Sequence, residues 1–335
     1  MNGSAGAGLD RPILLTGASG FVGHAVMEDL LRSGYRVRAL VRCPERFSSP
    51  EGVETFPGDV TDLQTVVRAG RDCQAAIHCA ADYRLALRPG EESRMIATNV
   101  GGTANVLEAA ARCGLRRVVH CSTVGTLAFE RSGRVLTESD LARSPSLLPG
   151  PYKRSKWAAE WLCLKRSPQG VAVVVVQPST PVGGGDRKPT PTGQMVRDFL
   201  LGRLPAYVET GLNVVAVEAV ARGHVLALER GVPGRSYILG DRNLSLRQFF
   251  QRLAQIAGRK APRWRIPISV GLAAAALSEL EARLRDRPPK LPLTSVRMAR
   301  HPMYVDARRA RDELGWSPGA LDEALRRAVA ELGPS

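Results

Sequence analysis

Short apolar runs alternate with helix-like stretches through the first half of the chain. The runs are rich in valine, leucine, isoleucine and alanine, and they lie at 12–16, 35–41, 53–60, 75–81, 116–123 and 171–179. Helical spacing of apolar positions is found at 21–33, 91–113 and 152–166. Because several runs are apolar at successive positions, they are typical of parallel strands covered on both faces by helices. The pattern predicts an α/β protein with a Rossmann-type, doubly wound parallel sheet.

The pattern changes after Pro178. Residues 179–193 are rich in glycine, proline and threonine, which predicts a long loop without regular structure. The following segments are shorter and less regular, except that 212–231 resembles a packed helix and 235–240 a strand. We therefore expect a doubly wound domain over 1–180, to which 212–240 returns, and a smaller substrate lobe over most of 181–335.

The stretch TGASGFVG joins the first predicted strand to the first predicted helix. Its glycines, Gly17, Gly20 and Gly23, permit a tight turn, a close approach of the backbone to a pyrophosphate, and close packing of helix on strand. The free N–H groups at the start of the helix then face the phosphates. A bare turn is the alternative, but this position in an alternating chain favours a dinucleotide.

The residues after the second strand indicate which dinucleotide binds. An NAD site usually has an acidic residue there for the ribose 2′-hydroxyl, yet no acid occurs between Asp29 and Glu45. Arg42 instead ends the strand, within a cluster that also contains Arg32, Arg36, Arg38 and Arg46. A guanidinium at this point pairs with a 2′-phosphate, so the sequence predicts NADP, with NAD as the alternative. Arg42 as an ordinary solvated loop residue is the competing interpretation.

A second group of residues carries candidate chemistry. Tyr152 and Lys156 are four apart in a predicted helix and share a face. The ammonium is expected to stabilise the phenolate and so lower the pKa of Tyr152, which would suit general acid–base catalysis. Ser122 and Thr123 end the fifth strand, where either hydroxyl could bond a substrate oxygen. Taken alone, the Tyr–Lys pair could be incidental.

These motifs together carry a resemblance that covers nearly the whole chain. TGASGFVG, GDVTD, HCAAD, TNVGGTANVLEAA, CSTVGT, YKRSK and QPSTPVGGGD resemble the extended short-chain dehydrogenase/reductases. AADYRLALRPGE, PSTPVGGGDRKPTPTG and SYILGDRNLSLRQ resemble more closely the hopanoid-biosynthesis-associated branch, which is often labelled sugar epimerase. That branch is similar to dihydroflavonol reductases and 3β-hydroxysteroid dehydrogenases.

The resemblance implies a role for particular residues. Tyr152 and Lys156 would be the catalytic pair, with Thr123 rather than Ser122 as the active hydroxyl. The residues that would bind the cofactor are Gly17, Ser19, Gly20, Phe21, Val22, Gly23, Arg42, Asp59, Val60, Ala80, Ala81, Pro178 and Ser179. In similar proteins the helices at 91–113 and 152–166 form a dimer interface, so a homodimer is expected.

The implied reaction is reversible hydride transfer between a nicotinamide and a carbinol or carbonyl carbon of a small apolar or lipid-like molecule. Two alternatives stay open: an NAD-dependent nucleotide-sugar epimerase or dehydratase, and a dinucleotide-sensing protein without catalysis. VGTLA replaces the VYG-like ending of many sugar epimerases, which weakens the sugar alternative. The intact Tyr152–Lys156 pair weakens the sensor alternative, because a sensor has no need of it.

Composition narrows the partners. The formal net charge is +15, but aromatic residues make up only 5%, and no basic low-complexity arm occurs, so nucleic-acid binding is not expected. The start of the chain lacks the pattern of a secretory signal, and six scattered cysteines without a C-x-x-C pair predict free thiols in the cytoplasm. His78 and His120 are interpreted as satisfied core residues. Because the five histidines lack ligand spacing, no metal site is predicted.

The C-terminal lobe bears on the substrate. Residues 267–284 form an apolar helical pattern in which Ile268, Leu272, Ala275, Ala276 and Leu280 share a stripe. The stripe is expected to face the core, although it could also supply an apolar wall for a sterol-like substrate. The basic segment 283–290 beside it could rest on an anionic membrane surface, at the inner face of the membrane. For a sugar nucleotide, Arg187, Lys188 and Arg197 could instead bind the diphosphate.

Overall fold

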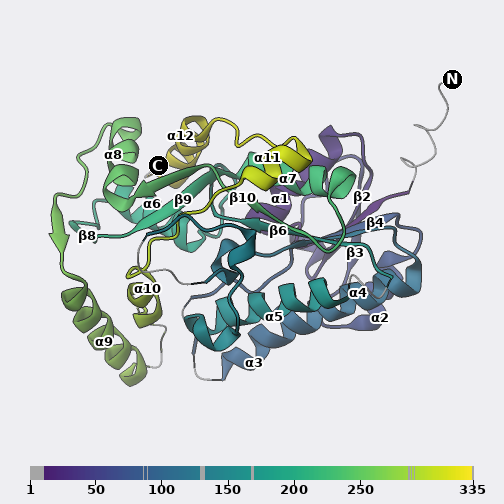
Figure 1. The fold of residues 1–335 in the computed structure, drawn as a ribbon, viewed down its shortest axis with the longest axis horizontal. Helices are drawn as coiled ribbons and strands as arrows, with labels where there is room; N and C mark the ends of the chain where they lie inside the picture. The colour runs from purple at the N-terminus through teal and green to yellow at the C-terminus, as the bar shows by residue number, and fades with distance from the viewer. Residues whose placement is uncertain are drawn as a thin grey trace.

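The computed structural model describes residues 11–85, 87–88, 90–128, 133–166, 170–285, 287, 289 and 291–333. Most of the N-terminal leader and part of the basic segment 283–290, including Lys290, lie outside the described residues. The main body is a parallel sheet between two layers of helices, and a smaller lobe is attached at one end (Figure 1).

The main sheet has seven strands in the order β10-β6-β5-β4-β1-β2-β3, and all their pairings are parallel. The strand order reverses between β1 and β4, which is where ligands bind in sheets of this kind. The strands are β1 Ile13–Thr16, β2 Val37–Val41, β3 Val53–Pro57, β4 Ala75–His78, β5 Val118–Cys121, β6 Val173–Pro178 and β10 Ser236–Leu239. The doubly wound sheet expected from the alternating pattern is confirmed.

Alternate side chains of the strands feed two separate cores. Leu14 packs with the layer of α2 and α4, whereas its neighbours Ile13 and Leu15 pack with the layer of α1 and α7. α5 lies beside α4 in the first layer (Figure 1). The helices of the main body are α1 Phe21–Arg32, α2 Leu63–Gly70, α3 Glu91–Ile96, α4 Gly102–Cys113, α5 Gly150–Arg166 and α7 Val217–Arg230. The predicted helix 91–113 is continuous, with one wider π-helical turn at 97–101 between α3 and α4.

The smaller lobe holds two short sheets. In one sheet the strand order is β11-β9-β7, and in the other β12 pairs with β8. Its elements are β7 Thr180–Val182, α6 Pro191–Leu200, β8 Ala206–Val208, β9 Gly211–Ala216, β11 Arg242–Ser245, α8 Leu246–Ala257, β12 Trp264–Ile266, α9 Ile268–Leu284, α10 Leu293–Met298 and α12 Leu321–Leu332. Helix α11 Arg308–Leu314 packs on α7 and β10 of the main body. Among the described residues no helix combines the length and apolar character that crossing a membrane requires.

Three sequence-based expectations differ from the structure. The loop predicted for 179–193 contains β7 and the start of α6, because β7 pairs with β9 and Thr190 caps α6. Residues 212–216 belong to strand β9 rather than to the packed helix, which begins at Val217; pairing with β7 and β11 overrides the helical pattern.

The third difference concerns the apolar stripe of α9. Ala275 is buried, but Ala276 is exposed and Leu280 is 56% exposed, so the stripe does not face the core as a whole. Leu277 and Leu284 are more exposed still. This helix packs mainly on the short helix α10 and lies at the outer edge of the lobe (Figure 1). Much of its apolar surface is therefore uncovered.

Candidate active site

The glycine-rich turn after β1 is shaped for a phosphate group. Gly17 has φ +79°, and a Cβ there would lie 2.5 Å from the backbone nitrogen of Ala80; a Cβ on Gly23 would lie 2.0 Å from the Gly17 carbonyl oxygen. Only glycine therefore fits at both positions. Gly20 caps α1 without a side chain, and the first turn holds no acidic residue. The amides of Phe21 and Val22 at the start of α1 are thus suited to an anion.

The ends of β1 and β4 are held in register by a buried histidine. Thr103 donates its hydroxyl to the Asn99 carbonyl (2.6 Å), so His78 Nε2 must donate to Thr103 (3.1 Å) and Nδ1 accepts from Thr16 (2.7 Å). Burial lowers the pKa of His78 to about 3, so the ring is neutral. The satisfied core role expected for His78 is confirmed, and it fixes the backbone just before Ala80.

His120 departs from the same expectation. It is buried beside His78, with ring centroids 5.4 Å apart, and burial lowers its pKa well below the ordinary value. Neither of its ring nitrogens has a hydrogen-bond partner in the part of the chain that the structure describes. His120 is therefore a neutral core residue, but the prediction that it is satisfied was wrong.

The arginine cluster separates into different roles. Arg38 donates to Glu54 (2.8 Å) and to the carbonyls of Ala69 and Arg71, so it braces β2 against β3 and α2. Arg42 is exposed directly after β2 and forms no ion pair with any described residue. Arg42, unlike Arg38, is thus available to an anionic ligand at the carboxyl end of β2.

The other predicted cofactor positions follow neighbouring strands of the sheet. Asp59 lies after β3 and accepts from the amide and hydroxyl of Thr61, while Val60 is buried against Gly102 of α4. Ser19 is exposed in the glycine turn; after β4, Ala80 is half-buried and Ala81 is exposed. At the end of β6, Ser179 has a buried hydroxyl oxygen without a described partner, next to Pro178. An orphaned polar atom at this edge fits a ligand that supplies the missing bond.

Tyr152 and Lys156 both lie in the first turns of α5, about one helical turn apart. Lys156 is buried, and its Nζ donates to the Cys121 carbonyl at 2.6 Å. Burial raises the pKa of Tyr152 well above its ordinary value, with Tyr83 and Cys121 adding to the rise, and burial lowers the pKa of Lys156. The expectation that Lys156 lowers the pKa of Tyr152 is therefore reversed here, because desolvation of the phenolate dominates.

The two hydroxyls that end β5 have different surroundings. Ser122 is buried and donates to the Glu160 carboxylate at 2.6 Å; Thr126 and Gln177 donate to the same carboxylate at 2.8 Å. Thr123 is less buried, and its Oγ1 accepts from the Gly125 amide at 3.1 Å, which leaves its hydroxyl proton unassigned. Ser122 belongs to a structural network, whereas Thr123 keeps a donor for another group.

Two further residues of this region, Asn99 and Tyr83, were not predicted from the sequence. Asn99 is buried in the π-helical turn 97–101 that precedes α4. Its side-chain oxygen accepts from the Asp82 amide (2.7 Å), and its side-chain nitrogen donates to the Ser155 hydroxyl of α5 (2.9 Å). The ring of Tyr83 packs against that of Tyr152 in a tilted arrangement, with ring centroids 4.5 Å apart and an interplanar angle of 41°. The TNVGGT stretch signalled Asn99 weakly, but nothing in the spacing of Tyr83 pointed to Tyr152.

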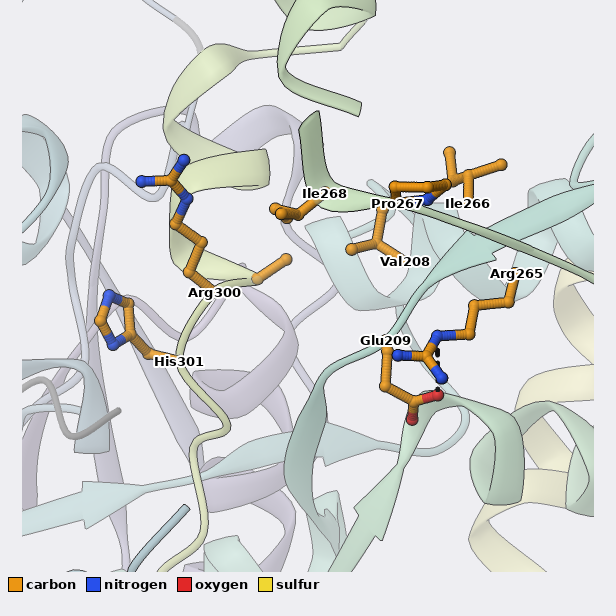
Figure 2. A pocket seen from close by; sticks show the side chains of 9 residues that line it. Val208, Glu209, Arg265, Ile266, Pro267, Ile268, Arg300 and His301 are labelled. Carbon is orange, nitrogen blue, oxygen red and sulfur yellow. Dashed lines mark ion pairs between the residues drawn. The ribbon is translucent and has the colours of Figure 1, made fainter. Parts of the chain in front are cut away.

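A pocket of about 470 Å³ opens in the smaller lobe. Val208, Ile266, Pro267 and Ile268 form an apolar wall, while Arg300 and His301 lie on the opposite side (Figure 2). At one edge Arg265 pairs with Glu209 at 3.6 Å.

The pocket lies beside α10, which reaches the start of the helix that carries Tyr152. Arg300 and His301 of the pocket follow α10, and Thr294 of α10 contacts the start of α5, since a Cβ at Gly150 would lie 2.7 Å from Thr294. Arg187, Lys188 and Arg197 are exposed and do not line this pocket.

The strand order, the glycine cradle and the Tyr152–Lys156 pair define a Rossmann-type enzyme that uses a nicotinamide dinucleotide. The chain belongs to the NAD dependent epimerase/dehydratase family, whose model matches residues 13–240. It is an NAD(P)-dependent oxidoreductase of the extended short-chain dehydrogenase/reductase class.

Two relatives span almost the whole chain. A Synechocystis sp. protein that carries the provisional name dihydroflavonol 4-reductase is 38% identical, over 94% of this chain and 92% of its own length. Sterol demethylase protein B of Methylococcus capsulatus is 30% identical, over 95% of this chain and 97% of its own length. Among solved structures, a nucleoside-diphosphate-sugar epimerase from Pseudomonas aeruginosa is 25% identical with a TM-score of 0.78, over 96% and 97% of the two chains.

Proposed function

We propose that this enzyme is an NADP-dependent dehydrogenase or reductase that acts on a carbinol or carbonyl carbon of an apolar, lipid-like molecule such as a hopanoid, steroid or flavonoid-like compound. The observation that carries the proposal is a pocket with an apolar wall beside α10, the helix that contacts the start of the Tyr152–Lys156 helix. The names of the two relatives, a dihydroflavonol 4-reductase and a sterol demethylase protein, support a flat apolar substrate.

The chain's own residues divide the work. The bound nicotinamide supplies or accepts the hydride. We assign Tyr152 to donate or remove the proton of the substrate oxygen, Thr123 to orient that oxygen with its unassigned hydroxyl proton, and Lys156 to hold the nicotinamide ribose. Ser122 is excluded from this role because its proton is already donated to Glu160.

We assign cofactor binding to the carboxyl ends of the strands. Gly17, Ser19, Gly20, Phe21, Val22 and Gly23 hold the pyrophosphate, and Arg42 binds the 2′-phosphate of NADP. Asp59 and Val60 flank the adenine, Ala80 and Ala81 line the path of the ribose, and Pro178 and Ser179 contact the nicotinamide. The cofactor domain comprises 1–180 together with 212–240, and most of 181–335 forms the substrate lobe.

We also propose a homodimer through the helices at 91–113 and 152–166. Ile96 and Trp161 are each 46% exposed on these helices, which suits a surface that a second copy covers.

A cytoplasmic enzyme with a lipid-like substrate also needs access to a membrane. We propose that α9 rests on the inner, anionic face of the membrane: Leu277 is 67% and Leu284 80% exposed. Residues 259–300 contain ten basic and three acidic side chains, so the charge of the lobe complements anionic lipid.

The deciding experiment is NADP(H)-linked turnover on a panel of hydroxysteroids, hopanoid alcohols or aldehydes, and nucleotide sugars. The proposal expects turnover on the first two groups. Activity confined to nucleotide sugars would replace the proposal with the epimerase or dehydratase function. Two observations support that alternative: the pocket contains the cations Arg265 and Arg300, and the fold is similar to that of a sugar epimerase. Binding of dinucleotide without turnover on any substrate would favour the sensor.

The cofactor that copurifies provides an independent check. A hydride-transferring reductase must exchange its cofactor at each turnover, so we expect NADP to be lost easily on gel filtration. An epimerase oxidises and reduces its substrate within one cycle, and it would retain NAD. Mass spectrometry of the cofactor released from the purified protein distinguishes the two.

A further inference from the structure

Three side chains that are remote in sequence meet beneath the proposed nicotinamide site. Cys79 directly follows β4, Cys121 ends β5, and His224 lies in α7; one ligand atom from each lies within 4.8 Å of those of the other two. His78 and His120 are paired in the parallel register of β4 and β5. The next residue of each strand, Cys79 and Cys121, is therefore adjacent and turned to the opposite face, toward α7.

The histidine of this cluster is oriented by its own helix. His224 is fully buried, and its Nδ1 lies 2.8 Å from the Val220 carbonyl oxygen. A carbonyl can only accept, so Nδ1 carries the proton and Nε2 presents a lone pair. Nε2 is buried and has no hydrogen-bond partner among the residues that the structure places. A backbone carbonyl that fixes the tautomer of a histidine is the usual arrangement around a bound metal ion.

We propose that Cys79, Cys121 and His224 form a binding site for one thiophilic divalent ion of the Zn²⁺ class. Two sulfur atoms and one imidazole are the donor set that such an ion prefers, and a water molecule completes a tetrahedron. On binding, both thiols release their protons to solvent, so that two thiolates balance the charge of the ion. The sequence predicted no metal site, because 42 and 103 residues separate these ligands and no local spacing reveals them.

The site is joined to the catalytic region through the backbone. The Cys121 carbonyl accepts the hydrogen bond of Lys156 at 2.6 Å, and Cys79 immediately precedes Ala80. A metal ion that draws the two cysteines together displaces both strand ends. Occupation of the site is therefore expected to inhibit the enzyme.

The test is calorimetric titration of the full chain with Zn²⁺, followed by titration with Co²⁺ for its thiolate charge-transfer and tetrahedral visible bands. We expect one site with a dissociation constant below about 1 µM and release of protons on binding. Loss of one ligand should weaken binding more than about 100-fold, beyond the cost of losing an outer contact. The ligand variants are Cys79→Ala, Cys121→Ala and His224→Asn.

Two controls separate this site from other thiols. Cys73→Ala removes a buried cysteine outside the cluster, and Cys43→Ser removes an exposed one; both should bind Zn²⁺ like the wild type. No binding by the wild type, or equal loss in the Cys73→Ala control, would overturn the proposal. If Cys121→Ala fails to fold, the Zn²⁺ affinities of Cys79→Ala and His224→Asn decide the question. Wild-type affinity for Zn²⁺ in both of these variants would overturn the proposal. These measurements need no substrate, so their result is independent of the proposed reaction.

Discussion

The glycine cradle and the pocket of the smaller lobe present different chemistry to a ligand. At the cradle the backbone dominates: Gly17 and Gly23 leave no room for side chains, and free amides at the start of α1 face outward. At the pocket, side chains dominate, with an apolar wall on one side and Arg300 and His301 on the other. Backbone amides suit the pyrophosphate of a dinucleotide, which stays the same whatever the substrate, whereas side chains can be adapted to one substrate. Substitutions at the cradle should thus change the turnover of every substrate, whereas substitutions in the lobe should change the turnover of only some substrates.

The largest effect is expected for Tyr152→Phe, which removes the transferable proton but keeps the ring against Tyr83. Turnover should fall by about 10²–10⁴-fold on every accepted substrate, because proton transfer is lost, while cofactor affinity changes little. Steady-state kinetics with fluorescence titration of NADPH measures both quantities. Unchanged turnover on any substrate would remove Tyr152 from the mechanism.

Thr123→Ala and Ser122→Ala form a matched pair of adjacent hydroxyl deletions. Thr123→Ala should lower kcat roughly 100-fold, the scale for losing one donor to the reacting oxygen. Ser122→Ala should instead lower the free energy of unfolding by about 1–3 kcal/mol, because Glu160 loses a buried donor, with little effect on kcat. Urea unfolding and kinetics on both variants test this, and the reverse pattern would make Ser122 the active hydroxyl.

Arg42→Ala tests the cofactor end by itself. Loss of a charged hydrogen bond should weaken NADPH binding by about 1.5–3 kcal/mol and leave NADH nearly unaffected. Arg36→Ala, at another exposed arginine of the cluster, serves as the control. Calorimetric titration with both cofactors gives the answer; equal losses for NADPH and NADH would mean that Arg42 does not bind the 2′-phosphate.

Leu277→Glu tests the lobe. If α9 inserts into lipid, losing one apolar side chain should weaken binding to vesicles that contain phosphatidylglycerol by about 1.5 kcal/mol, roughly tenfold. NADPH affinity should not change. Leu147→Glu places the same change at a leucine that is 63% exposed outside the lobe, and it should bind vesicles normally. Cosedimentation measures the partition, and equal behaviour of the two variants would contradict membrane contact through α9.

The remaining prediction concerns the stability of the main body rather than a binding or catalytic effect. Burial lowers the pKa of Lys153 from 10.5 to about 7. Between those values the unfolded chain holds a proton that the folded chain lacks, so stability rises with pH by about 1.4 kcal/mol per pH unit from this group. Below about pH 7 both states are protonated and the slope vanishes. Lys153→Met should lose this slope in urea unfolding between pH 7.5 and 9.5, and parallel curves for variant and wild type would contradict it.

Local patterns in the sequence predicted the main sheet and its ligand-binding edge. The apolar runs, the glycine spacing and the four-residue interval of Tyr152 and Lys156 depend on the geometry of one strand, one turn or one helix. The local patterns predicted the wrong structure where pairing with strands distant in sequence outweighs local preference. β9 forms because β7 and β11 pair with it, although its residues continue into a helical pattern.

The tertiary structure alone decided how the polar groups are used. In the folded chain Arg38 donates a hydrogen bond to Glu54 and Ser122 donates one to Glu160. The Lys156 ammonium donates to the Cys121 carbonyl rather than to Tyr152. The tertiary structure also brought together Cys79, Cys121 and His224 from two strands and a helix. The sequence by itself determines which residues share a helix face or a turn, because that spacing is local. Contacts between elements, and the desolvation that sets each pKa, exist only once the elements have packed.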